Sequence, residues 1–202
     1  MHLYDQLPVS PRSTVNATQS IRVLINALVT LPENGELPEE ACNHLEAAAK
    51  IIQSTATVTA SPRSPELSIG TYLDRSPVTG LANPIAPPLE MKVTENGVYS
   101  ASVRMGHQYQ GPPSRVHGGF IAVLLDHVMG MAASAPNDID GALTRSLTLE
   151  YLSATPLNTN LEVRGWIKER DGRKIWMEGE IVANGKTTVR AHGLWIAISS
   201  HG

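Results

Sequence analysis

The chain has 202 residues, of which 42% are hydrophobic and 17% charged, with a formal net charge of −3 at pH 7. This balance provides no broad basic field, so we expect no binding to nucleic acid or to an anionic membrane through charge. The longest apolar stretch, at 116–135, contains Asp126 and two histidines and does not qualify as a membrane span. The single cysteine, Cys42, excludes an internal disulfide framework and a thiolate zinc cage. The first residues show no signal peptide, and we expect a cytoplasmic protein.

The first part of the chain, residues 1–55, is predicted to be a helical extension. Apolar residues recur at helical spacing from Ile21 to Val29, and a break follows at 31–35. A second helix is predicted to begin near Pro38, because proline suits a first helical turn and the glutamates after it suit the helix dipole. Residues 56–88 are rich in proline and are predicted to form an extended strap without regular structure.

The pattern changes to strands from about residue 89, and residues 89–202 are predicted to form the main domain. Tight turns are predicted at Asn96-Gly97, Asp171-Gly172 and Asn184-Gly185. A single helix is predicted at about 118–134. The predicted strands lie at 89–93, 98–103, 143–152, 161–168, 174–182 and 187–198. Consecutive strands with tight turns predict an antiparallel meander. The class is therefore α+β, with a sheet of five to six strands curled around one helix and an edge or face left for a partner subunit.

The central helix has two unequal faces. At 100° per residue, one side gathers bulky residues that we expect to pack on the sheet: Phe120, Ile121, Leu124, Val128 and Met131. The other side is small except at Val123 and Asp126: Gly119, Ala122, Val123, Asp126, Gly130 and Ala133. Aspartate is a mediocre residue inside a helix, and apolar neighbours flank it here. Asp126 therefore has either a structural partner on another element or a chemical role.

The start of this helix carries the second candidate feature, His117-Gly118-Gly119. The first N–H groups of a helix have no internal partners, and the dipole adds positive potential there. The two glycines either form an oxyanion hole or only allow a tight entry into the helix. Gly118 and Asp126 are separated by about 12 Å along the axis. A reacting carbonyl must lie about 3 Å from both groups, so the carboxylate should come from a second copy of the helix.

These residues resemble those of the hotdog-fold acyl-CoA thioesterases of the PaaI-like type, in the 4-hydroxybenzoyl-CoA thioesterase superfamily. The matching features are Val116-His117-Gly118-Gly119, Asp126 and 130–133. The resemblance covers about residues 80–198 and includes the strand order and the segment 83–89. It implies a hotdog fold and hydrolysis of an acyl-CoA thioester to a free carboxylic acid and coenzyme A. It also implies a homodimer or a dimer of dimers, and it implies no cofactor.

The resemblance also implies roles for individual residues. Gly118 would polarise the thioester carbonyl with its N–H, Asp126 would act as nucleophile or general base, and His117 would orient the loop. Relatives often carry a hydroxyl residue at the position of Gly130, so that assistance either comes from Ser134 or Thr144 or is absent. The substrate-binding set would be Gly119, Asn83, Gly130, Ser134 and Thr144.

Two departures from the family pattern leave an alternative function open. The missing hydroxyl at Gly130, and 153–156 in place of the usual Arg-Pro pair, allow a non-catalytic protein that binds acyl-CoA as a sensor or carrier. A basic set on one hairpin is either a solvated strand end or a contact for coenzyme A phosphates: Arg164, Lys168, Arg170, Arg173 and Lys174. No metal site is expected, because the histidines are scattered, and no Gly-x-Ser-x-Gly elbow is present.

Overall fold

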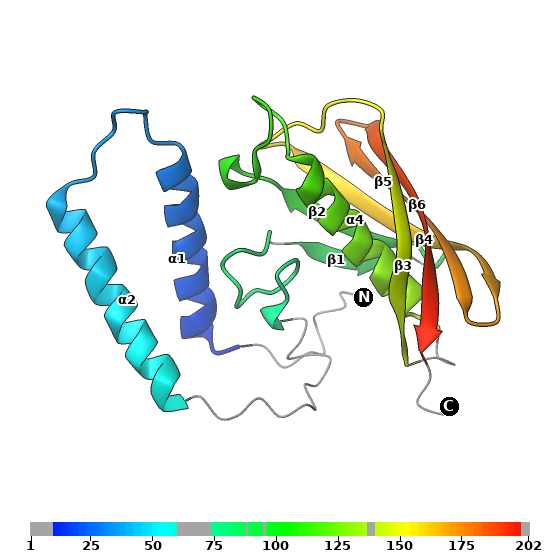
Figure 1. The fold of residues 1–202 in the computed structure, drawn as a ribbon, viewed down its shortest axis with the longest axis horizontal. Coiled ribbons are helices and arrows are strands. Elements are labelled where there is room, and N and C mark those ends of the chain that lie inside the picture. Colours follow the sequence, from blue (N-terminus) through cyan, green and yellow to red (C-terminus); the bar gives the residue numbers. More distant parts are fainter. Residues whose placement is uncertain (1–9, 60–73, 88, 95, 137–139, 199–202) are drawn as a thin grey trace.

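The computed structural model describes residues 10–59, 74–87, 89–94, 96–136 and 140–198. Two helices come first, and a sheet with one helix and one short 3₁₀ turn follows (Figure 1). In chain order the elements are α1 (Arg12–Val29), α2 (Glu39–Thr59), β1 (Glu90–Val93), β2 (Tyr99–Arg104), η2 (His107–Tyr109), α4 (Gly118–Ala133), β3 (Gly141–Tyr151), β4 (Asn160–Asp171), β5 (Lys174–Ala183) and β6 (Lys186–Ile198). The predicted helices and strands are confirmed to within a few residues, whereas η2 was not predicted.

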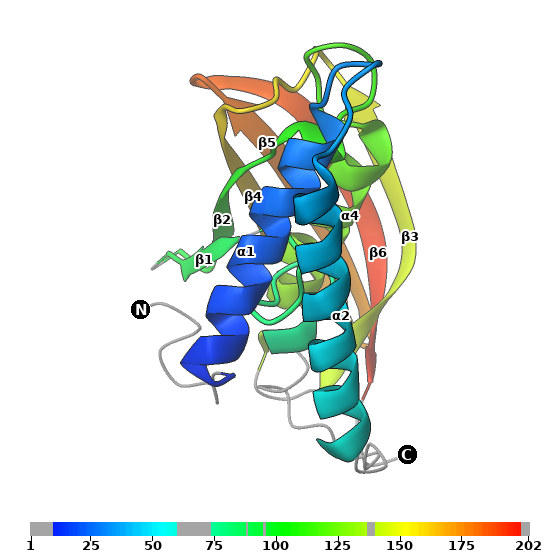
Figure 2. The ribbon, with the colours of Figure 1, turned by 90° about the vertical axis from the view of Figure 1, so that its left-hand side faces the viewer.

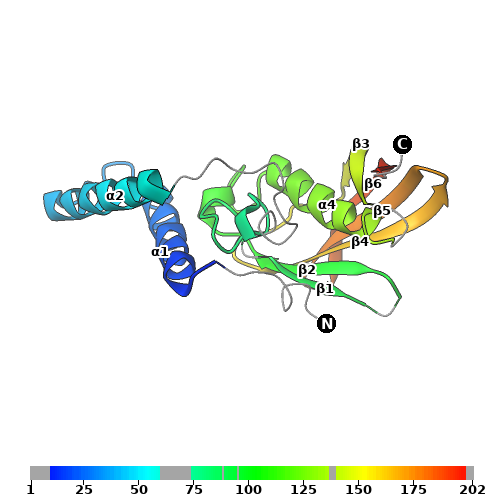
Figure 3. The same ribbon diagram turned by 90° about the horizontal axis from the view of Figure 1, so that it is seen from below.

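The sheet has six antiparallel strands in the order β1-β2-β4-β5-β6-β3. Strands β4, β5 and β6 form the predicted meander. The prediction that β3 belongs to the same meander was wrong, since β3 pairs with β6 at the far edge while β2 pairs with β4. Figure 3 shows the sheet curving around α4, with β1 and β2 on one side of the helix and β3 on the other. This is the predicted sheet wrapped around one helix.

The tight turns follow the local sequence closely. At Asn184-Gly185 both residues have positive φ, 51° and 75°, as a type I′ turn requires. At the preceding hairpin Gly172 has a φ of 55°, but Asp171 pairs with Lys174. The turn is therefore centred on 172–173, one residue later than predicted. These turns bring β4, β5 and β6 together with little dependence on the rest of the fold.

Helix α4 packs on the concave side of the sheet through a face that includes the predicted Ile121, Leu124 and Val128 but is rotated from the predicted one. Its buried residues are Ile121, Leu124, Leu125, Val128, Met129, Ala132 and Ala133. Phe120, predicted to face the sheet, is 37% exposed, and Ala133, predicted to face away, is buried. The cause lies on the sheet, where Gly165 of β4 pairs with Gly179 of β5. The space above these two glycines admits Met129, so the helix is rotated about its axis.

The N-terminal helices form a hairpin (Figure 2) that lies beside the wrapped sheet (Figure 1). Helix α1 contacts η2, and its buried Arg22 donates hydrogen bonds to the carbonyls of Gly80, Asn83 and Ala86 at 2.8, 2.8 and 3.1 Å. Helix α2 is largely exposed and runs to Thr59, beyond the predicted end of the extension at residue 55. Residues 60–73 and 88 of the predicted strap lie outside the described residues. No helix in the described part of the chain has the length and apolar character to cross a membrane.

The glycine pair under α4 yields a prediction about stability. A Cβ atom added at Gly165 would lie 3.0 Å from Met129 Cα and 3.1 Å from Met129 N, against a rigid helix backbone. Gly165→Ala should therefore lower the free energy of unfolding by about 1–3 kcal/mol, measured by urea denaturation. In the control Gly130→Ala, the added Cβ would lie 3.4 Å from Trp195 Nε1, and this helical site should gain up to about 1 kcal/mol from propensity. Equal stability of both variants would contradict the close approach of α4 to the sheet.

Candidate active site at the central helix

The N-terminus of α4 leaves one backbone donor free. His117 is the N-cap residue, with extended φ and ψ of −64° and 134°, and its Nδ1 accepts the Gly119 N–H at 3.0 Å. The His117 carbonyl accepts the N–H groups of Phe120 and Ile121 at 3.0 and 3.2 Å. Within the described residues the Gly118 N–H has no acceptor. The two glycines therefore differ, because Gly119 completes the helix cap and Gly118 presents the available donor.

The Asp126 carboxylate is half-buried and is held by a hydroxyl group from β3. Thr144 Oγ1 donates to Asp126 Oδ1 at 2.8 Å. The register of β3 against β6 shifts between Thr144 and Ser146, which is a β-bulge at Arg145. Side chains alternate along a strand, so this extra residue turns Thr144 to the helix side together with Leu147. This hydrogen bond fixes the orientation of the carboxylate.

The other predicted hydroxyl, that of Ser134, has a different partner. Ser134 Oγ accepts the N–H of Ala142 at 3.0 Å and closes the loop between α4 and β3. Gly130 faces the buried Trp195, whose Nε1 would lie 3.4 Å from an added Cβ. The structure thus brings Thr144, and not Ser134, to the carboxylate.

Asn83 lies in the segment that Arg22 holds. Its Nδ2 donates to the Arg75 carbonyl at 3.1 Å, and its Oδ1 accepts the Ile85 N–H at 3.1 Å. Both side-chain atoms therefore stabilise the turn in which Asn83 lies. A role for Asn83 near the reacting centre stays a prediction.

Tyr151, at the end of β3, is a further residue at the helix N-terminus. Its hydroxyl donates to the Gly118 carbonyl at 3.0 Å. Strand alternation puts Tyr151 on one face with Leu147 and Leu149, but nothing in the sequence indicates that this face meets the start of α4. The contact depends on the long-range pairing that puts β3 beside the helix.

His127, next to the carboxylate in sequence, is a half-buried titratable group. Its Nε2 is buried and has no hydrogen-bond partner among the described residues. Burial lowers the pKa of His127, and the nearby Asp126 charge opposes this effect. The neutral imidazole is therefore the favoured form. No three His, Cys, Asp or Glu side chains gather into a metal site in the part of the chain that the structure describes.

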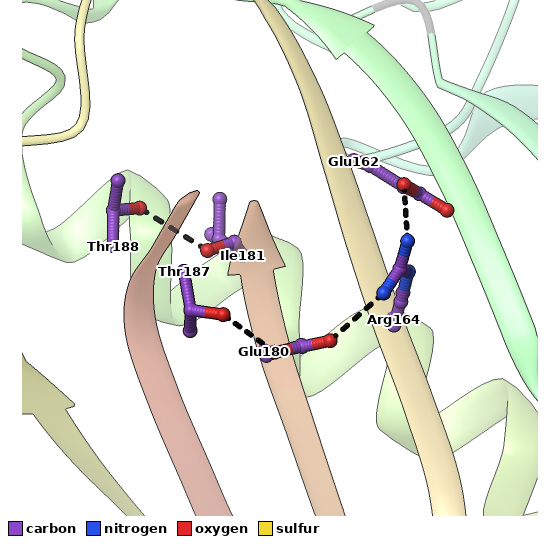
Figure 4. A network of polar contacts seen from close by, with 6 residues as sticks. All are labelled: Glu162, Arg164, Glu180, Ile181, Thr187 and Thr188. Carbon is purple, nitrogen blue, oxygen red and sulfur yellow. Dashed lines mark hydrogen bonds and ion pairs between the residues drawn. The ribbon is translucent and has the colours of Figure 1, made fainter. Parts of the chain in front are cut away.

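The outer face of the sheet carries the charged network of Figure 4. Arg164 lies between Glu162 and Glu180, at 2.7 and 3.0 Å, and Thr187 Oγ1 donates to Glu180 at 2.9 Å. The Arg164 hydrogen bond lowers the pKa of Glu162, and the carboxylates raise the pKa of Arg164. Two of the cations considered for coenzyme A phosphates, Arg164 and Lys168, are thus paired with glutamates. This face lies opposite α4 and away from Asp126.

Comparison with known proteins places the chain in a family. A family model described as the thioesterase superfamily matches residues 114–190. A thioesterase superfamily protein of known crystal structure is 30% identical in sequence to this chain. The structural match covers 94% of this chain and 93% of that chain, with a TM-score of 0.80. The chain belongs to the thioesterase superfamily. The expected hotdog fold is confirmed, and the N-terminal helices fall within the matched length.

Two further relatives match smaller parts of the chain. The PaaI protein from the phenylacetic acid degradation operon of E. coli is 17% identical, with a TM-score of 0.51, and covers 55% of this chain and 80% of that chain. This likeness concerns the fold. The acyl-coenzyme A thioesterase THEM4 of Xenopus laevis is 32% identical over 76 residues, which are 38% of this chain and 33% of that protein. The chain thus matches about a third of the length of its curated relatives.

Burial of His127 predicts a pH dependence of stability. The pKa of His127 is lower in the folded chain than in the unfolded chain. Below about pH 6.5 the unfolded chain therefore binds a proton at His127 that the folded chain does not yet bind. The stabilising contribution is present above that pH and is lost as the pH falls through the folded pKa. Urea denaturation at about pH 7.5 and about pH 5 should show a smaller loss for His127→Gln than for the wild type. The control His192→Gln changes an exposed histidine and should keep the wild-type loss. A His127→Gln loss as large as that of the wild type would contradict the burial.

Proposed function

We propose that this chain hydrolyses an acyl-CoA thioester to a free carboxylic acid and coenzyme A. The observation that carries the proposal is the free Gly118 N–H at the start of the helix that also carries Asp126, a carboxylate oriented by Thr144. Membership of the thioesterase superfamily and the acyl-coenzyme A thioesterase among the relatives support it. The missing hydroxyl at Gly130 no longer favours a non-catalytic role, because Thr144 provides a hydroxyl to the carboxylate.

The chemistry follows from these two groups. The thioester carbonyl accepts the Gly118 N–H, and the positive end of the α4 dipole stabilises the negative charge that develops on its oxygen. Asp126 either attacks the carbonyl carbon itself or removes a proton from an attacking water. The bond from carbon to sulfur breaks, and coenzyme A leaves as the thiolate. In the nucleophilic route water then hydrolyses the acyl-aspartyl anhydride.

One chain cannot assemble this site. Helix α4 is continuous from Gly118 to Ala133, so the two groups lie about 12 Å apart along its axis. The reacting carbonyl needs both groups at about 3 Å. We therefore assign Gly118 of one chain and Asp126 of a second copy to each site.

The surface beside α4 favours such a pairing. Strand β3 is an edge strand of 11 residues, a length of unpaired backbone that invites pairing with another chain. Apolar side chains are exposed along it and along α4, with exposed fractions of 62% for Leu143, 53% for Tyr151, 41% for Val123 and 37% for Phe120. A two-fold axis at this edge would pair the two β3 strands antiparallel and bring the two α4 helices side by side. The partner in the proposal is thus a second copy in a homodimer.

The first test is thiol release from a panel of acyl-CoA thioesters by the wild type and by Asp126→Asn. The substitution keeps the size of the side chain but removes its nucleophilic and basic oxygen, so kcat should fall roughly 10²- to 10⁴-fold. Circular dichroism and size-exclusion chromatography should show the wild-type fold and mass. Tight acyl-CoA binding by a wild type that shows no turnover would overturn hydrolysis and favour the sensor or carrier.

The second test removes the backbone donor alone. Gly118→Pro deletes this N–H, while proline is tolerated at the first helical position and the extended His117 suits a residue before proline. Activity should fall roughly 10²- to 10³-fold, as for the loss of one oxyanion donor. The matched control Gly118→Ala also adds a Cβ, 3.2 Å from Tyr151 Oη, but keeps the N–H. If Gly118→Ala loses as much activity as Gly118→Pro, the N–H is not the decisive group.

Mixing these variants tests whether the site is shared. A dimer of one Asp126→Asn chain and one Gly118→Pro chain holds one intact shared site, so random mixing should restore about a quarter of the wild-type activity. If both groups acted within one chain, every site in the mixture would lack one of them. No recovery in a mixture shown to exchange subunits would therefore overturn the shared site.

A further inference from the structure

The peptide group between Gly118 and Gly119 is held at both of its polar atoms. Its carbonyl oxygen, on Gly118, accepts the Tyr151 hydroxyl at 3.0 Å. Its N–H, on Gly119, donates to His117 Nδ1 at 3.0 Å. The two partners come from different elements, since His117 caps α4 and Tyr151 ends β3. A planar peptide group fixed at both ends cannot rotate without losing one of these bonds.

The preceding peptide group carries the donor of the proposed site. It joins His117 to Gly118, and its carbonyl accepts the N–H groups of Phe120 and Ile121. Its own N–H, on Gly118, is the free one. Only the φ and ψ rotations at Gly118 lie between the two peptide groups, and glycine restricts these rotations less than any other residue. The hydrogen bonds on the two peptide groups therefore supply the restraint that glycine lacks, and together they hold the direction of the Gly118 N–H.

We propose that Tyr151 is a positioning residue whose hydroxyl keeps the Gly118 N–H directed at the thioester carbonyl. This assignment rests on the proposed function. Preorganised donors stabilise a transition state because they need no reorientation as charge develops. Tyr151 holds such a donor through the neighbouring carbonyl and does not itself touch the substrate.

The surroundings of Tyr151 support this role over simple packing. Its side chain is 53% exposed in the single chain, so the ring adds little to the hydrophobic core. A Cβ at residue 118 would lie 3.2 Å from the Tyr151 oxygen, so glycine leaves room for the hydroxyl at hydrogen-bond distance. Tyr151 also stands on the edge strand of the proposed dimer. Pairing of two β3 strands would then fix the strand that orients the donor, and would couple assembly to the geometry of the site.

The experiment compares Tyr151→Phe with the matched control Tyr99→Phe. Each variant loses one phenolic hydroxyl and keeps the ring, and the Tyr99 hydroxyl binds none of the described residues. Loss of one hydrogen bond that acts in the transition state should lower kcat for acyl-CoA hydrolysis about tenfold, with KM unchanged. Tyr99→Phe should keep both constants. A second readout is amide hydrogen exchange of Gly119 by NMR, which should become faster only in Tyr151→Phe.

The outcomes separate this assignment from the proposed function. An inactive wild type would overturn the hydrolase and the catalytic part of the assignment together. An active wild type with equal kcat in Tyr151→Phe and Tyr99→Phe would overturn the positioning role and leave hydrolysis standing. A rise in KM alone, or an equal loss of kcat in both variants, would show a structural or binding effect and would also overturn the positioning role. A selective fall in kcat with faster exchange at Gly119 supports it.

Discussion

The fixed rise of an α-helix is the constraint on which the proposed site depends. It separates the free N–H of Gly118 from the carboxylate of Asp126 by about 12 Å, and no side-chain rotation closes that distance. A second copy would then explain two features of the single chain, the edge position of β3 and the exposed apolar side chains on α4. Among the described residues the long edge strand β3 has no second neighbouring strand, and Phe120 and Val123 on α4 are exposed. In the proposed dimer a second copy would cover both of these surfaces and would place its own α4 beside the first.

The sheet determines which side of α4 remains available for contact with a second copy. The paired Gly165 and Gly179 accept Met129 and so set the rotation of the helix. With this rotation Asp126 comes to the border of the buried face, beside β3. The bulge at Arg145 then turns Thr144 toward the carboxylate. The position of one acidic group thus depends on two glycines and one extra strand residue that do not touch the reacting atoms.

Features set by neighbours in sequence were predictable, and features set by distant pairing were not. Asn184-Gly185 gives its turn because both residues tolerate positive φ, and the helix from Gly118 follows from its apolar run and open N-terminus. The edge position of β3 had no local signal, so Tyr151 could not be assigned to the start of α4. The choice between Ser134 and Thr144 depended on a bulge that a regular alternating pattern does not contain. Phe120 was assigned to the core because hydrophobicity alone does not distinguish a face that packs on the sheet from one left open.

The N-terminal helix is linked to the same site through polar contacts. Burial lowers the pKa of Arg22, and no carboxylate among the described residues pairs with it. Four backbone carbonyls of 80–86 and the side-chain oxygen of Gln19 accept its hydrogen bonds instead. That segment continues to Ile85, whose carbonyl accepts the Tyr109 hydroxyl at 3.0 Å. The Tyr109 ring meets Phe120 edge to face, with the ring centroids 4.9 Å apart. Because Phe120 lies in the first turn of α4, α1 is connected to the helix end that carries the Gly118 N–H. A buried cation without its partner carbonyls is costly, so the segment and α1 are held together as one unit. The extension is thereby connected, through Tyr109 and Phe120, to the first turn of α4.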